Sequence, residues 1–393
     1  MQRKAYALVG AAAAIAAAVG PLLGGFITTF LSWRVAFFGE VVIIAIVLVG
    51  SRRVHDVPYT GDRGVDIVGA ILSAVGMGGV VLGILVWEEG GEAVGALIAL
   101  GLVAIGSLVW WLRRRKREGK PALLDIDLFS SKYFRLGISS QTLQQIALGG
   151  LMIALPIFLQ MVLEYNALEA GLSLAPLSLT MFAVALLAGR KLGGKSPSRI
   201  IRMGFLLLVV GVVVLLPIVP RADSGLAMAL PLAIAGAGLG LLVSQLNNYT
   251  LSPIEEERVS EAAGVNSAGG SFGLAFGLAF AGAIMLASLS LVFTNEAESS
   301  DVLTPAQQQQ VADGLERNAE VMSNTELDQL LEGQPEAVQQ EILDINTDAR
   351  PIALQIALLV PLIAALLGLF NGFRMTRIPD PEPSSAAESV LGG

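Results

Sequence analysis

The stretch GAAAAIAAAVGPLLGGFITTFLSWR, residues 10–34, decides the fold class of this chain. It carries no charge before its final arginine, and about 20 apolar residues are enough for a helix to cross a bilayer. Ala16, Gly20 and Gly24 are spaced four residues apart, so they form a stripe of small residues that lets membrane helices approach closely. Pro21 removes one backbone donor beside that stripe and bends the helix. The stretch therefore predicts a kinked transmembrane helix that packs tightly on a partner.

The composition places the whole chain among proteins that cross a membrane several times. Hydrophobic residues make up 54% of it and charged residues 15%. The absence of cysteine excludes disulfides, a thiolate nucleophile and cysteine–metal sites. The single histidine, His55, lies in a polar stretch, and the sequence shows no paired carboxylates and no nucleophile–base set. We therefore expect no enzyme activity, no cofactor, no metal site and no nucleic-acid partner.

Ten apolar segments emerge from the hydropathy pattern, and the distribution of Lys and Arg orients them. With the N-terminus inside, only four of the 25 basic residues fall on the outer side. This bias predicts a multi-pass protein of the cell membrane, embedded in the lipid bilayer, with both termini in the cytoplasm. The segments lie at about 5–31, 35–50, 66–87, 94–112, 136–160, 167–188, 201–219, 225–247, 262–293 and 352–372.

The first segment also carries a more specific pattern. Gly20-Pro21-x-x-Gly24-Gly25, followed by Ser32-Trp33-Arg34, resembles the antiporter motif in the fifth helix of drug/proton exporters of the major facilitator superfamily. With two spans inserted between its halves, the chain is similar to the fourteen-span drug/proton antiporters of that superfamily, which act in multidrug efflux. The ten segments then correspond to helices five to fourteen of the family.

This resemblance implies an all-α membrane fold, a helical bundle of the major facilitator type. It also implies proton-coupled export of amphipathic small molecules by alternating access, with the proton gradient as the energy source. The chain would divide into the remainder of the N-terminal half, an inserted pair of linking helices, the C-terminal six-helix half, and a tail whose Pro/Ser/Glu-rich composition predicts disorder. These parts are residues 1–53, 54–117, 118–378 and 379–393.

A polar extracytoplasmic loop, residues 294–351, interrupts the C-terminal half. Thr304-Pro305 supplies an N-cap and a first helical residue, and Pro335 marks a second start. We expect two or three short helices there.

Amide side chains concentrate on the segment at 136–160. Gln141, Gln144 and Gln145 are three and four residues apart, so they share one face of a helix. Buried amides need partners in lipid. The three glutamines therefore either line a central cavity or hold two helices together through hydrogen bonds.

The segment at 262–293 has a glycine stripe like that of the first segment. Gly269, Gly273 and Gly277 lie at i, i+4 and i+8. Together with Gly20 and Gly24 they give each half of the fold one helix suited to close contact, as expected where two bundles rock against each other.

Charges inside the spans are few, and one of them is Glu40, which lies in the second span about 9 Å in from Arg34 by helix rise. A carboxyl group in apolar surroundings holds its proton readily and could carry it across the membrane. It could equally pair with Arg34 near the outer interface, and its shallow depth favours that pairing.

The resemblance places four further helices ahead of the first segment. We therefore expect that Met1 is an internal methionine of a longer reading frame or the start of a truncated remnant. The alternative function is that of a truncated fragment, or of a membrane-embedded partner protein that lacks the proton-coupling helices. On that expectation the isolated chain inserts into a membrane but exports nothing.

Overall fold

The computed structural model describes residue 20 and residues 23–52, 66–86, 92–191, 195–308 and 323–381. Within these ranges there is no strand, and nine helical segments are long and apolar enough to cross a membrane. The all-α membrane class is therefore confirmed, with nine of the ten predicted spans in place. Most of the remaining one, at 5–31, lies outside the described residues, although residues 23–30 are helical.

The spanning helices follow one another in this order along the chain. They are α2 (Trp33–Ser51), α3 (Ile67–Leu85), α4 (Glu92–Arg117), α5 (Lys132–Ile157), α6 (Ala167–Lys191), α7 (Pro197–Ile218), α8 (Ala229–Leu251), α9 (Glu256–Ser299), and the consecutive pair α12 (Glu336–Ala357) and α13 (Leu359–Met375).

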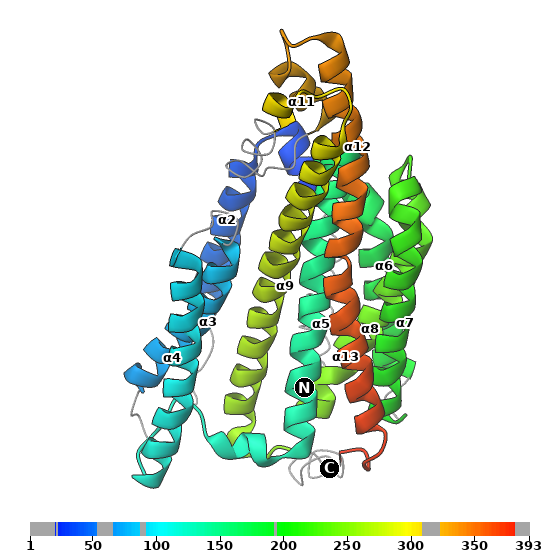
Figure 1. Ribbon diagram of the computed structural model, residues 1–393. Helices are drawn as coiled ribbons and strands as arrows, with labels where there is room; N and C mark the ends of the chain where they lie inside the picture. The colour runs from blue at the N-terminus through cyan, green and yellow to red at the C-terminus, as the bar shows by residue number, and fades with distance from the viewer. Residues whose placement is uncertain are drawn as a thin grey trace.

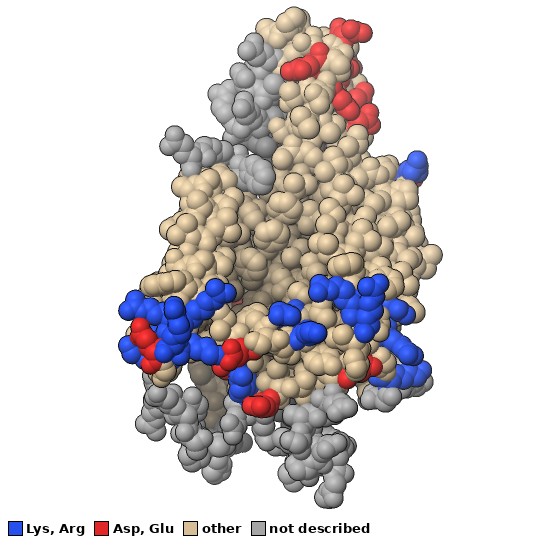
Figure 2. Space-filling view, turned by 60° about the horizontal axis from the view of Figure 1, so that its bottom comes forward, with Lys and Arg blue, Asp and Glu red and all other residues tan. Residues whose placement is uncertain are grey.

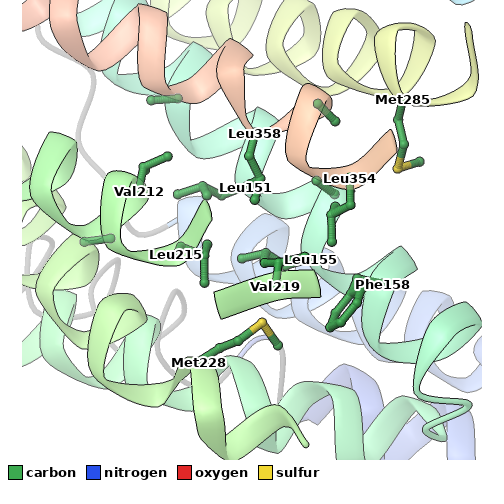
Figure 3. Packing of buried hydrophobic residues seen from close by; sticks show 14 of the residues in the cluster. Leu151, Leu155, Phe158, Val212, Leu215, Val219, Met228, Met285, Leu354 and Leu358 are labelled. Carbon is green, nitrogen blue, oxygen red and sulfur yellow. The ribbon is translucent and has the colours of Figure 1, made fainter. Parts of the chain in front are cut away.

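Helices α5 to α9, α12 and α13 form one bundle, as Figure 1 shows. Helix α8 packs on both α6 and α7, α9 packs along α5, and α13 lies against α5 and α7. Figure 3 shows how side chains of α5, such as Leu151 and Leu155, meet Val212 and Leu215 of α7 in the apolar core. Helices α3 and α4 pack on each other, and α3 lies against α9.

The charges are sorted to the two ends of the molecule. Figure 2 shows Lys and Arg gathered in a belt at one end, which we call the basic end. It contains the last turn of α4, with Arg114 to Arg117, and the start of α5, with Lys132 and Arg135. Acidic residues gather at the opposite end, where Figure 1 places α11 (Asn324–Leu330) and the start of α12.

The segment at 294–351 contains short helices, as expected, but the spanning helices on both sides also extend into it. Helix α9 continues to Ser299, and α12 begins at Glu336, directly after the predicted start at Pro335. Helix α12 then runs into the last span, with Pro351 in its interior. Among the described residues of this segment, α11 is a short helix, and residues 305–308 are also helical, directly after the predicted cap Thr304. Hydropathy detects the part of a helix that lies in lipid, whereas backbone hydrogen bonding continues through polar residues beyond it.

The tail at 379–393 is described only through residue 381, so its predicted disorder lies mostly outside the described residues. Asp380 lies against the start of α7, where its carboxylate accepts a hydrogen bond of 3.2 Å from the Ser198 N–H.

Candidate functional site

The glycine stripe of α9 lies directly against α5. A Cβ atom added at Gly273 would come within 2.5 Å of the backbone oxygen of Thr142, and one added at Gly277 would overlap the backbone oxygen of Ile146. At Gly269 the nearest atoms are side-chain atoms of Ile138 and Thr142, both at 3.3 Å. The two backbones therefore touch along about two helical turns, a separation that only glycine permits.

A hydrogen bond adds to this contact. The Thr142 hydroxyl donates to the backbone oxygen of Gly269 at 3.2 Å as well as to that of Ile138 in its own helix at 3.0 Å. In return, Gly149 of α5 leaves room for α9, because a Cβ there would lie 2.5 Å from the Leu274 oxygen. The interface thus has glycines on both sides.

Of the three glutamines of α5, Gln141 and Gln145 lie next to this contact. Gln141 and Gln145 approach Gly270 of α9, since a Cβ at that position would lie 3.5 Å from Gln141 Nε2 and 3.7 Å from Gln145 Cγ. Gln144 is 1% exposed. The Oε1 atoms of Gln144 and Gln145 are buried and have no hydrogen-bond partner within the described residues. Each can therefore accept a hydrogen bond from a polar group that enters this region.

The motif of the first span contacts the start of α6. A Cβ at Gly25 would overlap the backbone oxygen of Ala167, and the Thr29 hydroxyl accepts a hydrogen bond of 3.1 Å from the Leu168 N–H. Gly20 and Gly24 have no atom within 4 Å of an added Cβ among the described residues. Pro21 lies outside the described residues.

Arg34 and Glu40 do not form the pair favoured from the sequence. Among the described residues no ion pair joins them, and the Arg34 guanidinium instead lies over the Trp33 ring, 4.7 Å from its centre. Residues six apart in a helix point to different sides, whereas partners three or four apart meet. Glu40 is exposed on α2.

A buried carboxylate, which the sequence did not single out as a site residue, lies at the basic end. Asp66 is 5% exposed and caps α3, because its Oδ1 accepts from the Gly69 N–H at 2.9 Å. The same oxygen accepts from Trp111 Nε1 of α4 at 2.9 Å, and Oδ2 accepts from the Leu123 N–H at 3.0 Å. Burial by itself raises the pKa of Asp66. The hydrogen bonds and the charge of Arg115 lower this pKa by more than burial raises it, so the net shift is downward.

The loop after α4 is in turn fastened to α9. The Asp125 carboxylate pairs with Arg258 of α9 at 3.0 Å and with Lys116 of α4 at 3.1 Å. The Asp125 N–H donates to the carboxylate of Glu261, also on α9. Burial raises the pKa of the Asp125 carboxyl, and the hydrogen bonds and these cations outweigh that effect. Helices α3 and α4 are thereby joined to the larger bundle through polar groups.

At the opposite end, Arg350 of α12 connects the outer helices to α5. Its guanidinium is buried and donates to the Met161 oxygen at 2.6 Å and to Asn324 Oδ1 at 2.7 Å. Close by, the Glu164 carboxylate accepts hydrogen bonds from both the N–H and the hydroxyl of Thr325. Together these bonds hold α11 against the end of α5. From the sequence, Arg350 was only one of the four basic residues expected on the outer side of the membrane.

Comparison with known proteins shows which family this chain resembles. The family model described as Major Facilitator Superfamily matches residues 2–278. Multidrug resistance protein Stp of Mycobacterium tuberculosis (strain H37Rv) is 26% identical to this chain, over 77% of the chain and 56% of its own length. Lincomycin resistance protein LmrB of Listeria monocytogenes is 30% identical, over 52% of the chain and 44% of its own length. The chain thus spans about half the length of the curated relatives it matches.

Proposed function

Because this chain belongs to the Major Facilitator Superfamily, we propose that it forms all or part of an efflux transporter that exchanges amphipathic small molecules for protons. The observation that carries this proposal is the match of residues 2–278, together with relatives named for multidrug and lincomycin resistance. The nine apolar helices among the described residues make it a multi-pass membrane protein. The sorting of basic residues to one end supports a cell-membrane location with the basic end in the cytoplasm (Figure 2).

The close backbone contacts would serve the alternating movement of the two halves. Proteins of this kind work by rocking one helical bundle against another around a site near the middle of the membrane. Gly25 against Ala167 is a place where a helix of the N-terminal half touches one of the C-terminal half without an intervening side chain, whereas the Gly273–Thr142 contact joins two helices within the C-terminal half. Such surfaces allow small shifts of one helix along another. The remaining residues of the predicted motif, Gly20, Pro21 and Gly24, would have the same role.

Gln141, Gln144 and Gln145 would line the path of the substrate. Two of their amide oxygens are buried without a partner among the described residues, so a passing molecule with a donor group could be bound there. The alternative is that the glutamines hold two helices together through hydrogen bonds. The approach of Gln141 and Gln145 to α9 supports this alternative. Glu40 would be the proton-carrying carboxyl group in the second span, since it forms no ion pair with Arg34.

The domain boundaries are part of the same proposal. Residues 1–53 would belong to the N-terminal half and 118–378 to the C-terminal half, and 54–117 would form the pair of helices inserted between them. The extensive packing of α3 on α4 supports this division, although α3 also lies against α9.

Transport assays in inverted membrane vesicles test the function. We would express the 393-residue chain, and in parallel its natural reading frame with any upstream codons, in a bacterium that lacks its own drug exporters. Vesicles of the functional form should accumulate a lipophilic dye when a proton gradient is applied, and addition of dye should release protons. A protonophore should abolish both signals. Absence of both signals in both forms, with the protein inserted, would contradict export and favour the non-transporting alternative.

Single alanine substitutions decide between the two roles of the glutamines. Gln141→Ala and Gln145→Ala should change which dyes are exported while the amount of folded protein stays the same. Gln340→Ala is the matched control, because this amide lies at the opposite end and, among the described residues, bonds only to Asp344 at 3.0 Å. Loss of folded protein without a change in dye selection would favour the clamp.

A further inference from the structure

The last turn of α4 carries the densest positive charge in the chain. Residues 113–120 read RRRKREGK, so six of eight positions are basic. Helix α4 packs on α3 and otherwise faces outward, with Val109 37% and Trp110 55% exposed just before the charged turn. Figure 2 shows this end of the molecule with its belt of Lys and Arg.

Four of these six cations have partners in the loop that follows the helix. Arg114 and Lys120 both pair with Glu118 at 2.8 Å, and Lys116 pairs with Asp125 and Asp127. Arg115 donates from Nε to the Pro121 oxygen at 2.7 Å. Their charges are therefore used to hold the loop that follows α4.

Arg113 and Arg117 are different. Both are exposed, and neither has a carboxylate within ion-pair distance in the part of the chain that the structure describes. Arg117 Nε donates only to the Arg113 backbone oxygen of its own helix, at 3.4 Å. The two lie four residues apart on one face of α4, and Trp110 precedes them on the same face at i−3 and i−7. Two like charges at this spacing repel each other, so an anion between them is stabilising.

We propose that the headgroup of an anionic phospholipid binds between Arg113 and Arg117, with Trp110 beside its glycerol region. A guanidinium binds a phosphate through two parallel hydrogen bonds, which makes arginine well suited to this ligand. Tryptophan is enriched at the level of lipid headgroups, and clusters of Lys and Arg next to a spanning helix attract anionic lipids. The site takes a lipid rather than free phosphate because it adjoins the exposed apolar side of a spanning helix, where acyl chains lie. This inference needs only the membrane location and not the proposed export.

Quenching of tryptophan fluorescence by brominated lipids tests the site. The chain has four tryptophans. Replacement of Trp33 and Trp87 by Phe leaves Trp110 and Trp111 as reporters. The protein is placed in phosphatidylcholine nanodiscs that contain the same small fraction of either brominated phosphatidylglycerol or brominated phosphatidylcholine. The anionic quencher should be enriched at the reporters, by about fivefold for each arginine that binds it.

The double variant Arg113→Gln/Arg117→Gln should remove most of this preference. The matched control Arg114→Gln/Lys120→Gln removes the same charge from the same helix end but leaves Arg113 and Arg117 in place, so it should keep most of the preference. Circular dichroism confirms that both variants remain helical. Equal quenching by the two lipids in the parent protein would overturn the proposal. An equal loss in both double variants would also overturn it, since the summed charge of the helix end would then explain the attraction.

Discussion

The Trp111 indole nitrogen donates a hydrogen bond of 2.9 Å to the Asp66 carboxylate, which joins the end of α4 to the beginning of α3. The same carboxylate caps α3 and binds the backbone of Leu123, so three separate stretches of chain meet at one buried side chain. From Leu123 it is two residues to Asp125, which pairs with Arg258 of α9. The helix pair is therefore tied to the larger bundle at its basic end.

Removal of the Asp66 carboxylate should loosen this junction. In Asp66→Ala the Trp111 N–H and two backbone N–H groups lose their acceptor, and a buried donor left without a partner costs about 1–3 kcal/mol. We expect a lower midpoint of thermal unfolding in detergent, followed by intrinsic fluorescence. Asp301→Ala, which removes an exposed carboxylate, is the control. An equal fall in both variants would show that the junction is unimportant for stability.

The same residue predicts a dependence of stability on pH. The pKa of Asp66 is lowered in the folded protein from its ordinary value of 3.8, so the unfolded state binds the proton more tightly. The stability that the charged carboxylate contributes is therefore fully present above that value and is lost as the pH falls through the lower folded pKa. Asp66→Asn lacks this titration. The difference in unfolding midpoint between wild type and Asp66→Asn should be constant above about pH 5 and shrink below about pH 4.

Other carboxylates also titrate in acid, but they do so in both proteins, and the difference isolates Asp66. A difference that stays constant down to about pH 3 would contradict this assignment.

The contact between α5 and α9 should not tolerate even one methyl group. A Cβ at Gly277 would overlap the Ile146 oxygen, which is backbone and cannot rotate away, so Gly277→Ala must push the helices apart. Overpacking of this kind costs about 1–3 kcal/mol. A Cβ at Gly264 in the same helix meets no atom of the described residues within 4 Å, so Gly264→Ala serves as the matched control. The yield of monodisperse protein and the thermal midpoint should fall only in Gly277→Ala. Equal behaviour of the two variants would mean that the helices are not in backbone contact.

Arg350 should control the position of α11. In Arg350→Gln the hydrogen bonds to Met161 and Asn324 cannot both be kept, so α11 should leave the end of α5 more often. A glutamate-specific protease should then cleave after Glu326 or Glu332 faster than in wild type, by several fold. Arg221→Gln is the control, because Arg221 is an exposed arginine whose side chain, within the described part of the chain, bonds only to the Pro217 oxygen. Unchanged cleavage in Arg350→Gln would show that Thr325 and Glu164 hold α11 without it.

Features that depend on neighbours along the chain could be predicted from the sequence. Apolar length predicted the spans, because a helix satisfies its own backbone in lipid whatever it packs against. The four-residue spacing of Gly269, Gly273 and Gly277 indicated a bare helix face. The sequence placed the end of α9 and the start of α12 too close to the membrane, because hydropathy does not detect the part of a helix that continues into water.

Features that depend on distant segments required the tertiary structure. A bare face does not reveal which helix covers it, and only packing selects Thr142 and Ile146 of α5 as the partners of the stripe. Trp111 lies 45 positions from Asp66, and Met161 lies 189 positions from Arg350. No local pattern links such pairs, since hydrogen bonds between them form only after the helices that carry them have been brought side by side by apolar burial.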